Sequence, residues 1–185
     1  MKKLTLLLLL VLICGISFAE FRGTEWGMSQ KEVMSIEKVE LAGDNEFLAG
    51  EGTILGYDCI IGYLFAEDKL CRSIYFIDKY LPDRKLIQAF HNLKQSLTEK
   101  YGAPQIDLRQ ILEQDLTSDY SEEDLLTLGY IEYLVEWETE KTIIQLTASA
   151  EMGNVGLLEV AAVYIGKDYQ KLWDDYQKKK SLEDL

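Results

Sequence analysis

The chain has 185 residues, of which 32 are acidic and 19 basic, so its net charge at pH 7 is −13. A surface this acidic repels nucleic acid and anionic lipid head groups, and both are therefore excluded as expected partners. The length suits one domain with room for a sizeable core.

The first 19 residues predict an export signal that is not part of the fold. Two lysines at the start, a run of leucines and a cleavage point before Glu20 follow the order of a signal peptide. The apolar run is short for a membrane span. We expect a signal peptide over 1–19, a single domain over 20–185, and a periplasmic or extracellular product with no transmembrane segment after signal removal.

A lipid anchor is the alternative reading of this segment. Cys14 lies at the end of the apolar run, where a bacterial lipoprotein carries its acylated cysteine. The residue before it is Ile13, which is larger than the small residue that this processing prefers. The small residues Ser17 and Ala19 suit cleavage before Glu20 instead. The sequence therefore favours a product without an anchor.

The mature chain begins with a predicted short helix and a hairpin. Ser29 and Glu32 have the spacing of a capping box, and a weak strand is expected around 46–49. The first hairpin is expected to turn at Glu67-Asp68. Its alternation assigns one apolar face to Cys59, Ile61, Tyr63, Phe65, Leu70, Ile74 and Phe76.

The other face of this hairpin provides the candidate partner surface. It carries the apolar side chains Ile60, Leu64, Tyr75 and Ile77. Apolar surface of this kind rarely stays bare on a soluble monomer, so we expect something to cover it. The same register places Cys59 and Cys71 on opposite faces, which predicts that they form no disulfide.

A long helix is predicted next. Its apolar residues recur at helical spacing and are Leu86, Phe90, Leu93 and Leu97. Asp83 is the expected N-terminal cap, and the helix is expected to end at Tyr101-Gly102-Ala103-Pro104. The single histidine, His91, falls on the solvent side of this helix, where a surface histidine is favoured over a general base or a ligand.

The segment 105–140 is strongly acidic, with eleven carboxylates against the single Arg109. An EF-hand loop needs a glycine at its centre, and the acidic stretch 115–124 contains none. A solvated loop or a short helix is therefore favoured, and a weak cation site is the alternative.

A second hairpin and a tail complete the chain. If Thr139-Glu140 is the turn, Tyr133, Val135 and Trp137 share a face with Thr142, Ile144 and Leu146. A further strand is expected over 157–165. The tail predicts a helix whose apolar residues are Tyr169, Leu172, Trp173 and Tyr176. This helix is the expected cover of the first hairpin, and a partner or a second copy is the alternative.

These elements predict an α+β fold. We expect an antiparallel sheet of about five or six strands with helices on one face, plus the C-terminal helix. The order helix–strands–helix–strands leaves open whether the chain consists of two αβββ halves.

Several motifs resemble a family of small exported bacterial proteins of unknown function. They are Phe21-Arg22-Gly23, Trp26-Gly27-Met28-Ser29 with Glu32-Val33, Tyr63-Leu64-Phe65, the helix end Lys100-Tyr101-Gly102-Ala103-Pro104, and Trp137-Glu138-Thr139. The resemblance covers most of the chain after the signal. It implies export and this fold, and it implies no activity, because the motifs are capping, turn and core residues.

The sequence favours a binding role over catalysis. It contains no nucleophile elbow, phosphate loop or dinucleotide fingerprint. The single histidine and the widely spaced Cys59 and Cys71 make no zinc pattern. We expect no cofactor. The predicted function is a non-catalytic envelope protein that binds a ligand or another protein, such as another envelope protein. A small hydrolase with a scattered site and a cation-responsive module are the alternatives.

Overall fold

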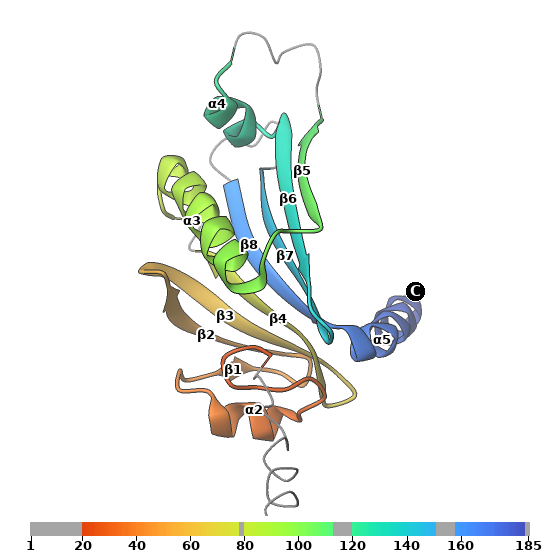
Figure 1. The fold of residues 1–185 in the computed structure, drawn as a ribbon. Helices are drawn as coiled ribbons and strands as arrows, with labels where there is room; N and C mark the ends of the chain where they lie inside the picture. The colour runs from red at the N-terminus through yellow and green to blue at the C-terminus, as the bar shows by residue number, and fades with distance from the viewer. Residues whose placement is uncertain (1–19, 78–79, 113–119, 151–157, 184–185) are drawn as a thin grey trace, which may run out of the picture.

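The computed structural model describes residues 20–77, 80–112, 120–150 and 158–183, and the predicted signal peptide lies outside them. An antiparallel sheet forms the centre of this part of the chain (Figure 1). The α+β class is confirmed. The described residues form eight strands, however, where the sequence predicted five or six.

The chain is divided into two halves of similar order. The first half contains α2 (Gln30–Ile36), β1 (Ala42–Gly43), β2 (Phe47–Ile54), β3 (Tyr57–Ala66) and β4 (Lys69–Ile77). The second contains α3 (Asp83–Tyr101), β5 (Ile106–Ile111), α4 (Glu122–Thr127), β6 (Ile131–Glu138), β7 (Thr142–Ala150) and β8 (Leu158–Gly166). The chain ends with η2 (Lys167–Tyr169) and α5 (Gln170–Glu183).

Each half folds its four strands as a meander, and the last strands of the two halves pair with each other. The strand order is β1-β2-β3-β4-β8-β7-β6-β5, with β4 antiparallel to β8. Both halves therefore place a helix before four strands, one more strand than the αβββ unit considered from the sequence. The second half also inserts α4 between β5 and β6.

Strand β5 was missed because it lies inside the acidic segment. It pairs with β6 from Ile106–Glu136 to Ile111–Ile131, and five of its six residues are exposed. An edge strand tolerates charged side chains on both faces, so its sequence lacks the alternation that marks a half-buried strand.

The helices of both halves cover one face of the sheet. The Ser29–Glu32 capping box is present at α2, which buries Val33. The predicted stripe of α3 is buried in the core. Its N-terminal cap is Pro82, which makes no side-chain hydrogen bond, so Asp83 is the first helical residue and not the cap. The helix ends before Gly102, as expected.

The β3–β4 hairpin turns at Glu67-Asp68, as predicted, but its register differs. Both turn residues have positive φ, 50° and 56°, which matches the twist of a tight hairpin. Leu64 then pairs with Arg72 while Phe65 pairs with Leu70, so Cys71 is the extra residue of a β-bulge. A one-residue slip exchanges the two faces of a strand, and it does so here for the rest of β4.

The β6–β7 hairpin also differs in register from the prediction, but its two faces are not exchanged. Trp137 pairs with Ile144, two positions away from the expected Thr142. A shift of two residues keeps every side chain on its own face, so the predicted apolar face is confirmed.

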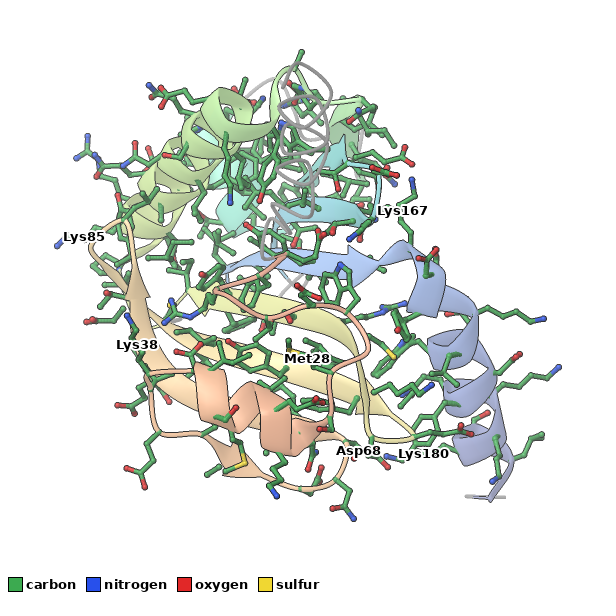
Figure 2. All side chains as sticks on the ribbon, turned by 60° about the horizontal axis from the view of Figure 1, so that its bottom comes forward. Met28, Lys38, Asp68, Lys85, Lys167 and Lys180 are labelled. Carbon is green, nitrogen blue, oxygen red and sulfur yellow. The ribbon has the colours of Figure 1, made fainter. Side chains whose placement is uncertain are left out.

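The N-terminal segment 20–28 joins the two halves on the helix-covered face. Phe21 packs on the rings of Tyr63, Tyr75 and Tyr164, with centroids 4.8 to 5.5 Å apart. The indole Nε1 of Trp26 donates to Thr142 Oγ1 over 2.9 Å. Figure 2 shows Met28 where this segment crosses the sheet. Segment 20–28 therefore contacts strands of both halves.

Candidate binding face

The face opposite α3 and α4 is much less covered, and we call it the open face. Ile61 and Ile60 are neighbours on β3, and their exposed fractions are 0% and 38%. Ile61 joins the core beneath the helices, whereas Ile60 points to the open face because successive side chains of a strand alternate. Of the described helices, α5 contacts β3 and β4, at the side of the sheet away from α3 (Figure 1).

A row of mostly apolar side chains crosses the open face. Its members are paired directly on neighbouring strands, so each lies beside the next. We call this set the apolar row: Leu108, Leu134, Thr147, Ala161, Phe76 and Ile60. Leu108 is 53% exposed and Ile60 38%, and the four between them are half-buried. The row therefore presents apolar surface to solvent across six strands.

Helix α5 covers a different part of the open face, near the β3–β4 turn. The Arg72 guanidinium lies 5.0 Å from the centre of the Trp173 ring and 3.8 Å from the Asp174 carboxylate. Tyr176 donates to Glu46 over 2.9 Å, and Lys180 also pairs with Glu46. The prediction that the C-terminal helix covers the first hairpin is thus confirmed for the end of the hairpin near its turn. The apolar row lies outside it.

A hollow of about 470 Å³ lies at the Ile60 end of the apolar row. Ile60 and Phe76 belong to both the row and the hollow, and Tyr80 forms part of the wall. The remaining lining residues are Glu51, Gly52, Asp58, Cys59 and Glu159. The hollow therefore combines apolar and aromatic surface with three exposed carboxylates.

The charge of the open face is unevenly distributed. The acidic side chains of its described strands are Glu51, Asp58, Glu132, Glu136, Glu138 and Glu159. The basic ones are Lys69 and Arg72, both near the β3–β4 turn. The surface around the apolar row is therefore negative, and its electrostatic complement is a basic surface.

The predicted partner surface is divided between the two faces. Ile60 and Leu64 lie on the open face, as expected. Tyr75 and Ile77 lie on the helix-covered face, with exposed fractions of 9% and 0%. The bulge at Cys71 is the reason, and the same slip places Ile74 and Phe76 on the open face in their stead. Alternation alone could not reveal the bulge, because Ile74-Tyr75-Phe76-Ile77 is apolar throughout.

Sequence reasoning also missed a buried ion pair in the first half. The Glu37 carboxylate, only 2% exposed, accepts from Arg22 Nε over 2.7 Å and from Arg22 Nη2 over 3.0 Å. The Tyr63 hydroxyl and the amides of Lys38 and Val39 also donate to it. Burial opposes ionisation, but these donors outweigh it and hold the pKa of Glu37 at about 2. The pair anchors segment 20–28 to β3.

The second half contains the same three residue types in an exposed cluster. Glu122 of α4 accepts from Tyr133 and, over 3.0 Å, from Arg109 Nε. The hydrogen bond from Tyr133 lowers the pKa of Glu122, and the one from Arg109 lowers it to a smaller extent. The Glu122 side chain is 60% exposed. The cluster of Glu122, Tyr133 and Arg109 therefore connects α4 and β5 to β6.

His91 is exposed on α3 beside Phe90, as predicted.

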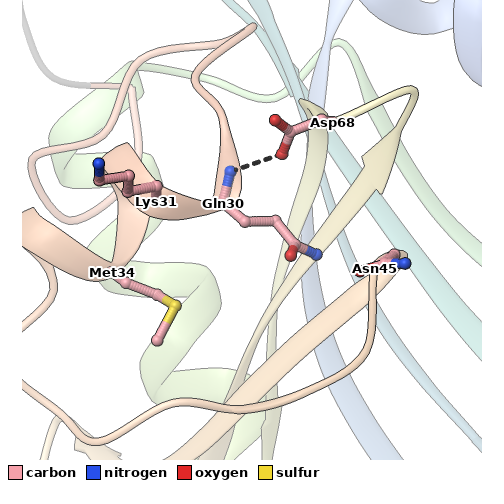
Figure 3. Close-up of a pocket in the computed structure, with 5 residues that line it drawn as sticks. All are labelled: Gln30, Lys31, Met34, Asn45 and Asp68. Atoms are coloured by element: carbon pink, nitrogen blue, oxygen red, sulfur yellow. Dashed lines mark hydrogen bonds between the residues drawn. The ribbon is translucent and has the colours of Figure 1, made fainter.

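A second hollow, of about 690 Å³, lies between α2 and the β3–β4 turn (Figure 3). Its lining residues are Gln30, Lys31, Met34, Asn45 and Asp68. The Gln30 amide donates to Asp68 Oδ1 over 3.0 Å, and the Gln30 side chain donates to the Asp44 carbonyl over 2.7 Å. These contacts fix α2 to the loops around it, so polar groups of this hollow already serve the fold.

The described residues hold no group of three His, Cys, Asp or Glu side chains placed to bind a metal ion. Part of the acidic segment, residues 113–119, lies outside the described residues. Cys59 and Cys71 are both free and buried. Burial raises the pKa of the Cys59 thiol to about 11, which keeps it protonated and unreactive at neutral pH.

Comparisons with protein-family models, with curated proteins and with solved structures found no match for this chain. The resemblance to small exported bacterial proteins therefore stays a sequence-based prediction. Within the described residues, none of the helices combines the length and apolar character needed to cross a membrane.

Proposed function

We propose that this protein is a non-catalytic exported envelope protein that binds another polypeptide through its open face. The observation that carries the proposal is the apolar row, which crosses six strands and remains partly exposed. A soluble protein rarely leaves contiguous apolar surface bare without a use for it. A sheet face of this extent suits a folded partner better than a single small molecule.

The charges of the face indicate the chemistry of the partner. Carboxylates surround the apolar row, whereas the basic residues Lys69 and Arg72 lie toward the β3–β4 turn. A partner with apolar side chains among lysines and arginines would match both features. We therefore infer a basic polypeptide surface as the occupant of the open face.

Three further observations favour binding over catalysis. Glu37 and Tyr63 form a hydrogen-bonded pair beneath segment 20–28, where substrate has no access. Glu122 is held by Tyr133 and by Arg109 on the exposed surface. Cys59 and Cys71 are buried. Each of these groups has a structural role that accounts for its position.

The test uses two variants that each add a lysine. Ala161→Lys places a positive charge in the middle of the apolar row, and Gln95→Lys places one on the exposed surface of α3. Proteins captured from envelope extract by the wild type would be identified and purified, and their affinities for each variant measured by calorimetry.

We expect Ala161→Lys to weaken binding of the true partner at least about tenfold, which is about 1.4 kcal/mol, and Gln95→Lys to change it less than about twofold. Leu108→Lys, at the exposed end of the row, gives a second variant if Ala161→Lys folds poorly. Equal affinities for the row variants and Gln95→Lys would refute the proposal.

Export is proposed on the sequence alone, and mass measurement tests it. The intact mass of the protein from its native host should correspond to a chain that starts at Glu20. A diacylglyceryl mass on a chain that starts at Cys14 would instead establish the lipid anchor.

A further inference from the structure

We propose that the hollow at the Ile60 end of the apolar row binds an alkylammonium or alkylguanidinium group. This inference deepens the proposed function and rests on it, because the group would be a lysine or arginine side chain of the bound polypeptide. The hollow of about 470 Å³ is large enough for such a side chain.

The floor of the hollow suits the alkyl stem of such a group. Ile60 and Phe76 are opposite each other on β3 and β4, and both point to the open face. A lysine or arginine side chain buries its methylene groups on apolar surface of this kind while its charged end stays in water. The Phe76 ring and the Tyr80 ring, both in the lining, offer π surfaces for the cation.

The rim of the hollow suits the charged end. Asp58 and Glu51 come from β3 and β2, and Glu159 comes from β8 on the other side of β4. The carboxylates thus approach from both sides of the floor, and the lining residues that the structure describes include no lysine or arginine. A cation gains from all three, whereas an anion is repelled.

Two features separate this hollow from the one beside α2. The α2 hollow has Lys31 in its lining, and Gln30 and Asp68 there bond to each other. The hollow at Ile60 instead continues the apolar row, so a polypeptide lying along the row would reach it. The position of the hollow therefore links its chemistry to the proposed interface.

The experiment titrates the full mature chain with small probes and follows backbone amide NMR shifts of Ile60 and Phe76. The probes are n-pentylammonium, its neutral counterpart n-pentanol, and a blocked tripeptide with a central lysine. We expect the ammonium to bind weakly, at about 1 to 10 mM, and the alcohol to bind several times more weakly. Equal shifts with ammonium and alcohol would overturn the proposal.

Variants locate the charge requirement. Asp58→Asn and Glu159→Gln should each weaken ammonium binding about twofold to fivefold, because exposed ion pairs contribute modestly. Glu123→Gln, which removes an exposed carboxylate from α4 on the other face of the sheet, should leave it unchanged. Unchanged binding in the Asp58→Asn, Glu159→Gln double variant would overturn the proposal, provided that its melting curve shows it folded.

The tripeptide distinguishes the two sources of the cation. Binding as strong as that of the ammonium supports a polypeptide side chain, and binding of the ammonium alone would overturn that source and indicate a free amine. The outcome is also separable from the proposed function. If Ala161→Lys abolishes partner binding while the hollow binds no cation, this inference fails and the open face remains the interface.

Discussion

Replacing Glu37 by glutamine should destabilise the fold more than any single change of an exposed carboxylate. The carboxylate is 2% exposed and accepts hydrogen bonds from Arg22, Tyr63 and two backbone amides. A pKa lowered from 4.5 to about 2 corresponds to about 3 kcal/mol in favour of the ionised form. Arg22 is 26% exposed and partly regains water in the variant, so we expect a loss of about 2 to 3 kcal/mol at pH 7.

The pH dependence of this loss has a defined sign. Because the pKa of Glu37 is lower in the folded chain than in the unfolded one, its contribution is present above about pH 4.5 and declines as the pH falls toward about 2. Urea denaturation followed by circular dichroism would measure the free energy of unfolding of the wild type and Glu37→Gln. The difference between them should shrink over that interval.

The exposed cluster of the second half supplies the matched control. Glu122 also accepts from an arginine and a tyrosine, but its side chain is 60% exposed. Glu122→Gln should therefore cost less than about 1 kcal/mol. Three results would contradict this role of Glu37: a Glu37→Gln stability within about 1 kcal/mol of the wild type, an equal loss in Glu122→Gln, or a Glu37→Gln difference that is constant with pH.

Burial and strand register also determine how the core, the cysteines and α5 respond to change. Ile61→Ala should cost about 2 to 5 kcal/mol and Ile60→Ala less than about 1, and similar losses would show that the two faces are misassigned. The mature chain should show two free thiols after denaturation without reductant, for Cys59 and Cys71, and slow labelling when native; no free thiol would contradict this. Deletion of 167–185 should lower stability and increase binding of apolar dyes, because α5 packs on β3 and β4, whereas unchanged values would mean that α5 is dispensable.

Much of the local structure could be predicted because neighbouring residues decide it. The capping box at Ser29 and Glu32, the stripe of α3 and the turn at Glu67-Asp68 each depend on a few residues close in sequence, and all three are present. The face of the second hairpin was correct even though its register was off by two. A period-two pattern is insensitive to an even shift.

The candidate binding face required the tertiary structure. The apolar row is made by six residues from six strands, and no spacing in the chain reveals that Leu108 and Ile60 lie at two ends of one line. The hollow likewise depends on Glu159 of β8 lying across β4 from Asp58, which only the β4–β8 pairing determines.

The sequence by itself determined the acidic charge, the α+β class, the main helix and the two hairpins. The tertiary structure decided which face of β4 meets solvent, because a bulge at Cys71 inserts one residue into a segment that is apolar on both sides. It also decided that Glu37 is buried and ionised, since its partner Tyr63 is 26 residues away. Local patterns record which side chains alternate, whereas pairing between distant strands determines what each face contains.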